Sequence, residues 1–431
     1  MLRIVLAAVV ALAGVALKAE PSITGLEVTQ DASTKVVTMK FNLSEKAIVT
    51  MDLLTNGVSI GADNYRGVRD VYSKNNSFPA NRVVAAGDKT WVWQPKSEWP
   101  GYAFDKGEFS VDIKAWSFDS PPDYMVIDAN VRSNAFFYAK AEDLPDGGLK
   151  RANQDDAEQL AELEKDVYRT TKIVLRKIPA AGVKWRMGSP EDEKYRRSDE
   201  TPHYVTLTND YYVAVYLFSF TQARNFFGTQ DSVTVNIGAK HNMSYTGSRG
   251  KIANYCWPED GHNVSPSSGF GYLRERTGFM FDFLTEAEWE YACRAGSGGK
   301  WCDGSESPSE VAWAKLSGGS RSYVPGGKNP NAWGIYDMHG LVNEWVLDQY
   351  GAYGEEAVVS PVGVTTNPEV RVLRGGPRNH QYNGSWTANV SVRSAYRGSY
   401  DPTKTVDGGS NGFGVRISCP ASLPEWFRQK D

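Results

Sequence analysis

The stretch from Asn331 to Gly351 reads NAWGIYDMHGLVNEWVLDQYG, and our interpretation of the fold starts from it. It sets aromatic side chains around glycines and carries the carboxylates Asp337 and Glu344. Glycine lets a backbone carbonyl turn inward where a Cβ would obstruct it. The two carboxylates and the backbone oxygens of Gly340 and Val342 would form an all-oxygen ligand set that suits Ca²⁺. The alternative is that Asp337 caps a turn and Glu344 pairs with a nearby arginine.

Length and composition favour a folded protein of two domains. The chain has 431 residues, of which 41% are hydrophobic and 23% are charged. A single core rarely grows to this size, and a disordered chain carries fewer hydrophobic residues. The net charge of −4 argues against a nucleic-acid partner, because binding to phosphates requires a basic face.

The first residues, 1–19, have the pattern of a secretory signal peptide. Arg3 precedes an apolar run from Ile4 to Leu17, and Ala19 is a small residue at a plausible cleavage point. The alternative, a membrane anchor, is disfavoured because the run is short and Lys18 interrupts its end. We therefore expect a secreted or periplasmic protein with no integral membrane segment in the mature chain.

Residues 20–140 predict an all-β sandwich of the immunoglobulin or fibronectin type. Residues 37–43 alternate between apolar and polar, which is typical of a half-buried strand, and Asn56-Gly57 predicts a turn after the next strand. Further strands are expected at 90–93, 109–118 and 134–139. A linker with a short helix (141–171), a second domain (172–421) and a tail (422–431) follow.

The second domain has few regular elements, and two of them are predicted to be helices. Thr221–Phe227 is amphipathic, with Thr221 available as its cap. Leu284–Cys293 contains a capping box formed by Thr285 and Glu288. Near the C-terminus, Val392–Arg397 is expected to be a strand.

The four cysteines are Cys256, Cys293, Cys302 and Cys419. In an oxidising compartment they allow two disulfides with three possible connectivities. Cys293 and Cys302 flank a glycine-rich turn, so their pairing is the first to test. No zinc-ligand spacing is present.

Taken in order, the motifs of the second domain resemble those of the formylglycine-generating enzyme, or sulfatase-modifying factor, family. The resemblance covers roughly residues 172–419. Its landmarks are MGSP (187–190), DETPHYVTL (199–207), LTEAEWEYACRAG (284–296), NAWGIYDMHGLVNEW (331–345), LRGG (373–376), RSAYR (393–397) and GFGVR (412–416).

The resemblance implies an α+β, loop-rich domain related to C-type lectins and stabilised by calcium. It places a calcium site at Asp337, Gly340, Val342 and Glu344. Members that oxidise a sulfatase cysteine to formylglycine bind Cu(I) through two cysteines between the LRGG and RSAYR landmarks. Here that interval, residues 377–392, contains no cysteine, so copper is not expected.

Three kinds of function are compatible with this departure, and whether the chain is an enzyme stays open. The first is a non-catalytic module that binds an exported protein or a glycan, with ligand-binding candidates Arg378, His380, Tyr382, Trp386, Asn389 and Arg397. The second is an oxidoreductase that modifies exported proteins through an altered metal site, with His380 as a ligand. A diversified receptor of the same lectin-like fold is a third possibility. The histidine pattern of the iron-dependent sulfoxide synthases is absent.

Overall fold

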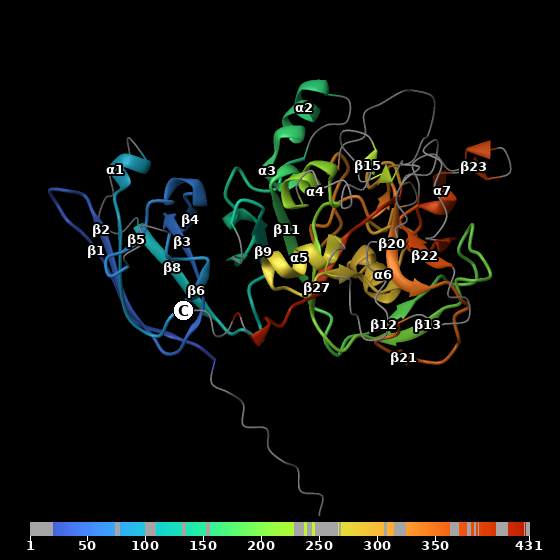
Figure 1. Cartoon of the computed structure of the whole chain (residues 1–431), viewed down its shortest axis with the longest axis horizontal. Helices are drawn as coiled ribbons and strands as arrows, with labels where there is room; N and C mark the ends of the chain where they lie inside the picture. The colour runs from blue at the N-terminus through green and yellow to red at the C-terminus, as the bar shows by residue number, and fades with distance from the viewer. Residues whose placement is uncertain are drawn as a thin grey trace, which may run out of the picture.

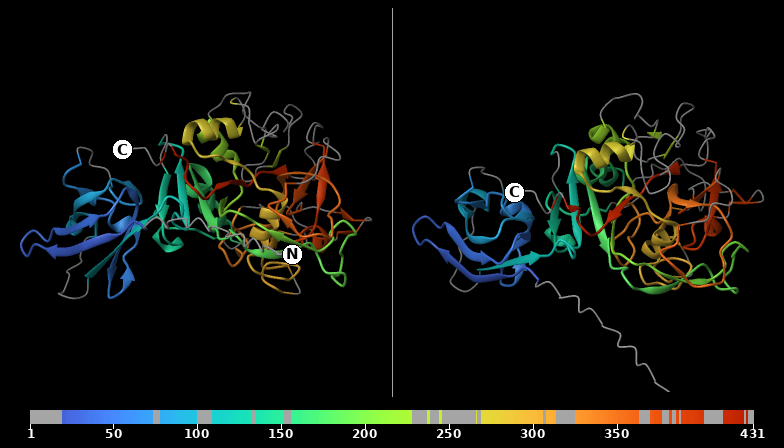
Figure 2. Two further views of the ribbon diagram at one scale, coloured as in Figure 1. Left: turned by 90° about the horizontal axis from the view of Figure 1, so that it is seen from below. Right: turned by 60° about the horizontal axis from the view of Figure 1, so that its bottom comes forward.

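The computed structural model has an all-β part at its N-terminal end and a larger, loop-rich α+β part beyond it (Figure 1). Two further views keep these parts at opposite ends of the molecule (Figure 2). The structure describes residues 20–73, 78–99, 109–131, 135–151, 156–227, 237–238, 244–245, 266, 269–305, 308–313, 325–362, 370–376, 381–382, 385–386, 388–401, 413–425 and 427.

Two sheets form the N-terminal part. The first has the order β1-β2-β7-β5, with strands β1 (Ile23–Gln30), β2 (Val37–Leu43), β7 (Gly87–Trp93) and β5 (Arg69–Asp70). In the second, β3 (Ala47–Thr55) pairs with β8 (Phe109–Trp116), β4 (Val58–Ser59) and β6 (Arg82–Val84). Two short helices, η1 (Ala62–Asn64) and α1 (Pro95–Glu98), lie in the connections.

The strand and turn patterns of this part are confirmed. Alternate residues of β2 are buried, as a strand with one face on a core requires. Asn56 and Gly57 join β3 to β4 with φ values of 50° and 75°. Positive φ at both positions is the geometry of a two-residue hairpin turn. The core between the sheets includes Phe41, Trp91 and Trp93.

The predicted boundary at residue 140 needs correction, because two strands before it belong to the second part. β9 (Tyr124–Asp128) pairs with β10 (Ala135–Tyr138) and with β11 (Lys172–Ile178). They form one side of a sheet with the order β10-β9-β11-β14-β27-β17. Alternating apolar residues correctly predicted a strand near 134–139, but they carry no information about which sheet it joins.

The segment between these strands carries the predicted short helix. It contains η2 (Ala141–Asp143), α2 (Ala157–Lys165) and α3 (Val167–Thr170). The Asp156 carboxylate accepts hydrogen bonds from the backbone N–H groups of Glu158 and Gln159, and so caps α2.

Small sheets and short helices make up the rest of the chain. The other strands of the large sheet are β14 (Tyr211–Ala214), β17 (Asp282–Phe283) and β27 (Ile417–Pro420). One small sheet contains β12 (Lys184–Met187), β13 (His203–Thr206) and β21 (Val358–Val359). Another has the order β25 (Gly398–Tyr400), β22 (Arg371–Arg374), β20 (Asn343–Gln349) and β26 (Phe413–Gly414). Three pairs of strands form the remaining sheets: β18 (Ala312–Trp313) with β19 (His339–Gly340), β15 (Ile237–Gly238) with β16 (Ser244–Tyr245), and β23 (Gln381–Tyr382) with β24 (Ser385–Trp386). The helices are α4 (Phe220–Phe227), α5 (Gly269–Thr277), α6 (Glu286–Arg294) and α7 (Ala388–Ser391).

Two local predictions in this part are wrong. Helix α4 begins at Phe220, so Thr221 lies inside the helix and does not cap it. Ser219 caps the helix instead. Its hydroxyl accepts from the N–H of Gln222 (3.0 Å), and the Gln222 side chain accepts from the N–H of Ser219 (2.7 Å). The expected strand at Val392–Arg397 is a turn between α7 and β25. Its two arginines are held by glutamates from other elements, and these distant contacts override the local strand preference.

Across the described residues, no helix combines the length and apolar character that a membrane span requires. The predicted signal peptide, residues 1–19, lies outside them.

Candidate functional site

Helix α6 presents a row of charged side chains to the interior. Glu286, Glu290 and Arg294 follow one another at four-residue intervals, so they lie along one face of the helix. All three are buried. The predicted capping box is confirmed: the Thr285 hydroxyl accepts from the N–H of Glu288 (3.2 Å), and the Glu288 carboxylate accepts from the N–H of Thr285 (2.9 Å).

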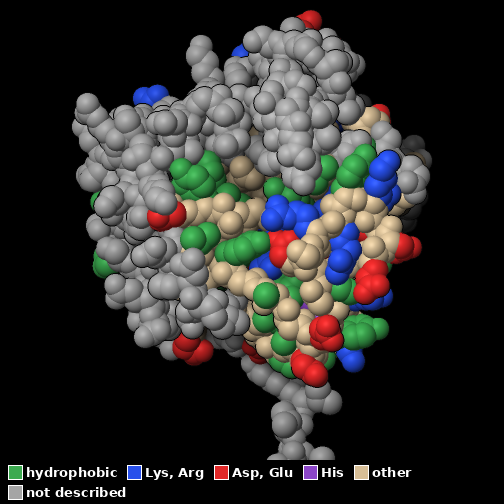
Figure 3. Space-filling view, turned by 90° about the vertical axis from the view of Figure 1, so that its right-hand side faces the viewer, with side chains coloured by type: hydrophobic (Ala, Val, Ile, Leu, Met, Phe, Trp, Pro, Cys, Tyr) green, Lys and Arg blue, Asp and Glu red, His purple; other side chains and the backbone are tan. Residues whose placement is uncertain are grey.

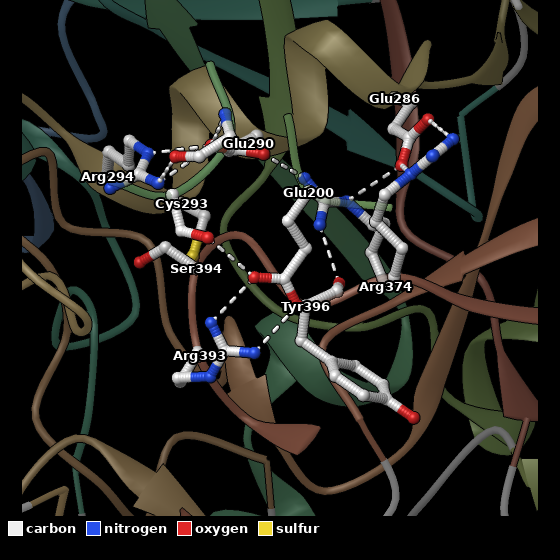
Figure 4. Close-up of polar contacts among 12 residues, drawn as sticks. Glu200, Glu286, Glu290, Cys293, Arg294, Arg374, Arg393, Ser394 and Tyr396 are labelled. Atoms are coloured by element: carbon white, nitrogen blue, oxygen red, sulfur yellow. Dashed lines mark hydrogen bonds and ion pairs between the residues drawn. The ribbon is translucent and has the colours of Figure 1, made fainter. Parts of the chain in front are cut away.

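The arginines of the LRGG and RSAYR motifs bind the glutamates on this face (Figure 4). Arg374 donates to the Glu290 carboxylate and to the carbonyl of Tyr396 (2.6 Å). Arg397 donates to both Glu286 oxygens, at 2.7 and 2.9 Å. Burial works to raise the pKa of Glu286, but Arg397 and then Arg374 lower it overall.

A second group of ion pairs joins RSAYR to the segment that follows the MGSP motif. Arg393 donates to both oxygens of Glu200, at 2.6 and 2.8 Å, and to Glu193 at 2.6 Å. The Ser189 hydroxyl donates to the same Glu200 carboxylate (2.7 Å). The neighbouring Gly188 donates its N–H to Glu290 (2.9 Å), so the two groups are connected.

These ion pairs fix both ends of the interval 377–392. Arg374 lies just before it, and Arg393 and Arg397 lie just after it. Removing one partner from a buried pair leaves a desolvated charge and typically costs about 3–5 kcal/mol, so the positions of the ends are strongly determined. Carboxylates paired with arginine favour the charged form and are poor general acids. We call these ion pairs, which join Arg374, Arg393 and Arg397 to Glu200, Glu286 and Glu290, the frame of the interval.

A glycine brings the two ends of the interval together. Gly376 has a φ of 83°, and a Cβ on it would lie 2.0 Å from the carbonyl oxygen of Ser391. Only glycine permits this approach without a shift of backbone. The start and the end of the interval therefore lie against each other.

Asp337 and Glu344, the predicted calcium ligands, are both buried and hydrogen-bonded to protein donors. The two oxygens of Asp337 accept from the Trp313 indole and from the N–H of Gly326, each at 2.7 Å. Burial raises the pKa of Asp337 to about 6. Both oxygens of Glu344 accept from the Arg416 guanidinium, at 2.8 and 3.0 Å.

This arrangement does not fit a calcium site. A cation at Glu344 would have to share its carboxylate with the Arg416 guanidinium, and like charges at that distance repel. The carbonyl of Gly340 accepts from the N–H of Val342 (2.9 Å). The alternative from the sequence, a Glu344–arginine pair, is present. Among the described residues, no group of three or more histidine, cysteine, aspartate or glutamate side chains is placed to hold a metal.

Of the six predicted ligand-binding residues, only Arg397 has a described side chain. Arg397 is buried and bonded to Glu286, so the structure uses it inside the frame and not at a binding edge. Arg378 and His380 lie outside the described residues. Tyr382, Trp386 and Asn389 belong to β23, β24 and α7, but their side chains lie outside the described part of the chain.

The predicted disulfide between Cys293 and Cys302 is not formed. Cys293, Cys302 and Cys419 are free and buried, and Cys256 lies outside the described residues. His339 donates through Nδ1 to the carbonyl of Val392 (2.8 Å), and its Nε2 faces the N–H of Cys302 (3.0 Å) and the Cys293 sulfur (3.6 Å).

The Cys293–His339 contact is a pair of neutral groups. Burial raises the pKa of Cys293 far above its usual range and that of Cys302 to about 12, and it lowers the pKa of His339 to about 4. The thiolate is the nucleophile and the metal ligand, so these protonated thiols are inert at neutral pH.

The main residues that sequence reasoning missed are the charged members of the motifs. Glu200, Glu286, Glu290, Arg374 and Arg393 were not singled out. Part of this role could have been predicted from the sequence, because charged residues at four-residue spacing occur in the same predicted helix as the apolar Trp289 and Ala292. Charges on the apolar side of a helix indicate buried ion pairs, since an unpaired buried charge is too costly.

Comparison with known proteins identifies similar chains. A formylglycine-generating enzyme from Streptomyces coelicolor is 31% identical over 155 residues, which cover 32% of this chain and 46% of that enzyme. The matched region thus spans about half the length of that relative. The solved structure of PvdO from Pseudomonas aeruginosa shares 25% identity, covering 57% of this chain and 94% of that chain, with a TM-score of 0.42. Treponema denticola variable protein 1 shares 18% identity, covering 58% and 95%, with a TM-score of 0.43.

The family is shown by a match to residues 180–418, which is more than half of the chain. The matched region contains the frame around α6 and both ends of the interval 377–392. The chain belongs to the sulfatase-modifying factor enzyme 1-like domain family.

Proposed function

We propose that this chain is an exported, non-catalytic member of its family, which binds a protein or a glycan through the interval 377–392. One observation carries the proposal: this interval contains no cysteine. Formylglycine generation in the family depends on two thiolates there, because Cu(I) prefers soft thiolate ligands.

The cysteines elsewhere in the described chain offer no substitute. Cys293 and Cys302 lie beside His339 in the interior, and Cys419 lies in β27. Burial raises the pKa of all three thiols. A buried, protonated thiol neither binds Cu(I) readily nor attacks a substrate.

The family frame supports a binding role because it holds the interval at both ends. Loops that project from a rigid scaffold commonly carry recognition residues. The interval contains His380, Tyr382, Trp386 and Asn389, and aromatic rings with amide groups form adaptable polar contacts. Figure 3 shows the face at the right-hand side of Figure 1, where Lys and Arg side chains lie beside acidic ones.

Arrays of glycans and exported proteins, probed with the full chain, test the binding role. We expect Trp386→Ala and Tyr382→Ala to abolish a signal that the unchanged chain gives. Tyr204→Ala is the matched control, because Tyr204 is an exposed aromatic residue on β13, outside the interval. A signal that all three variants retain would contradict the proposed surface.

The second candidate is an oxidoreductase that acts on exported proteins through an altered metal site. It is favoured by the likeness to the Streptomyces coelicolor formylglycine-generating enzyme. His380 is the residue of the interval that would supply a ligand, since imidazole binds copper. Stoichiometric copper binding that is lost in His380→Ala would support this candidate against the binding module.

A further inference from the structure

Tyr195 has a backbone conformation that tyrosine rarely adopts. It lies in the loop between β12 and β13, and its φ is 73°. A positive φ is strained for a bulky residue, and such strain persists only where the surrounding structure holds it. The Tyr195 side chain is 42% exposed, so packing of the ring in a core does not offset the strain. The turn itself does not require a tyrosine, because glycine would adopt this φ without strain.

The fully buried Arg393 holds this conformation. Its guanidinium donates to the carbonyl of Tyr195 (2.8 Å) and to the carboxylate of Glu193 (2.6 Å). Two successive turns shape the loop: the N–H of Glu193 donates to the carbonyl of Pro190 (3.1 Å), and the N–H of Arg196 donates to the carbonyl of Glu193 (3.0 Å). Tyr195 is therefore presented on a fixed loop.

The same arginine connects Tyr195 to the interval 377–392. Arg393 is the first residue after the interval and belongs to its frame (Figure 4). Tyr195 thus lies within reach of one arginine side chain from the end of the interval.

Exposure alone does not produce this arrangement, as Tyr204 shows. Tyr204 is 50% exposed, and the Lys184 ammonium lies 4.6 Å from the centre of its ring. However, Tyr204 belongs to the regular strand β13, without a positive φ.

The exposed side chains of the loop supply both hydrogen-bond donors and acceptors. The Lys194 ammonium lies 5.0 Å from the centre of the Tyr195 ring. Glu191 and Asp192 are exposed carboxylates in the same loop. An ammonium donates and a carboxylate accepts, so the loop suits a ligand whose hydroxyl groups do both. The two carboxylates disfavour an anionic ligand, because like charges repel.

We propose that Tyr195 stacks on a sugar ring of a neutral glycan that the interval 377–392 binds. One face of a pyranose ring carries C–H groups and its rim carries hydroxyls, which match an aromatic ring bordered by donors and acceptors. A peptide strand is a poorer match, because the turns already use the N–H groups of Glu193 and Arg196 and form no extended edge. This inference rests on the function proposed above and narrows its ligand to a neutral glycan.

An array of neutral and acidic oligosaccharides, probed with the full chain, tests the contact. We expect signals on neutral oligosaccharides that Tyr195→Ala weakens by about tenfold, because the stacking surface is lost. Tyr195→Phe keeps the ring and should keep the signal. Tyr204→Ala is the matched control, since it also removes an exposed ring beside a lysine, and it should leave the signal unchanged.

A second measurement needs no ligand. Tyr195→Gly removes both the ring and the strain, so it should lose the glycan signal while its melting temperature stays equal to that of the unchanged chain or rises. A fall of more than about 4 °C would show that the ring stabilises the fold, and it would overturn the inference.

The outcomes separate this inference from the proposed function. A neutral-glycan signal that Trp386→Ala abolishes and Tyr195→Ala retains would overturn the inference and leave the proposed function standing. A signal that Tyr195→Ala abolishes, and that Trp386→Ala and Tyr382→Ala retain, would support the Tyr195 contact and contradict binding through the interval. Absence of binding to neutral glycans, including binding confined to acidic glycans or to proteins, would overturn the inference.

Discussion

At the scale of single residues, the ion pair between Glu344 and Arg416 stabilises the stretch of residues 331–351. Both groups are fully buried, and the Trp289 indole also donates to Glu344 (2.7 Å). We expect Glu344→Gln to cost about 3–5 kcal/mol of unfolding free energy, because it leaves the Arg416 charge unpaired. Urea unfolding should give the same loss with calcium and with a chelator.

The same comparison applies to the other predicted ligand. Asp337→Ala removes the carboxylate that accepts hydrogen bonds from Trp313 and Gly326. Its loss should also be equal in both media. A loss that appears only in calcium, for either variant, would show that these carboxylates are ligands and that the calcium site predicted from the sequence exists.

Asp143 gives a prediction about pH. Burial, with some help from Asp52 and against the pull of Lys140, raises the pKa of Asp143 to about 6 from 3.8. Between these values the folded state binds more protons than the unfolded state, so the contribution of Asp143 to stability falls as pH rises. Asp143→Asn removes this term. The variant should gain stability relative to the unchanged chain between pH 4 and pH 7.5, measured by urea unfolding.

Lys114→Met is a suitable comparison for the pH series, because Lys114 and its partner Asp112 are both exposed on β8. Its stability difference from the unchanged chain should vary little with pH. If the difference for Asp143→Asn is equally flat, Asp143 is ionised throughout and its burial has no effect on folding.

At the scale of single elements, helix α4 allows the predicted cap, Thr221, to be tested against the observed cap, Ser219. Ser219→Ala removes the hydroxyl that accepts from Gln222, and we expect a loss of about 1 kcal/mol. Thr221→Ala changes a position inside the helix, where alanine is favourable, so its effect should be near zero or stabilising. Thermal unfolding of both variants checks this. A larger loss in Thr221→Ala would restore the cap predicted from the sequence.

Local patterns predicted single elements well where the contacts that form them are also local. The hairpin at Asn56-Gly57 and the capping box of α6 were both foreseen. The turn at Val392–Arg397 was not, because Arg393 is held by Glu200, which lies far away in the sequence. Periodicity identifies a strand or helix but does not identify its distant partners.

At the scale of the whole molecule, the family and the α+β fold could be predicted from the motifs, but the division between domains could not. Ile48 of β3 packs in the same cluster as Met125 and Phe137, so the sandwich and the large sheet share apolar contacts. The role of the motif charges was also hidden. Glu290 meets Arg374 and Gly188 only after folding brings three motifs together.

Truncation tests the corrected boundary. A chain that begins at residue 141 lacks β9 and β10, which leaves one side of β11 uncovered. We expect it to be insoluble or unfolded, whereas a chain that begins at residue 117 should fold. Circular dichroism and proteolysis of the two products provide the comparison. Equal folding of both would show that β9 and β10 are dispensable.

We propose that this family member does not generate formylglycine, and an assay of that reaction decides between the two candidate functions. The purified chain, loaded with Cu(I), is incubated with oxygen and a peptide that contains Cys-x-Pro-x-Arg, and an active formylglycine-generating enzyme serves as the positive control. Mass spectrometry should show an unchanged peptide with this chain and an aldehyde with the control. An aldehyde formed by this chain would contradict the claim, because it would require a metal site without the thiolate pair in 377–392.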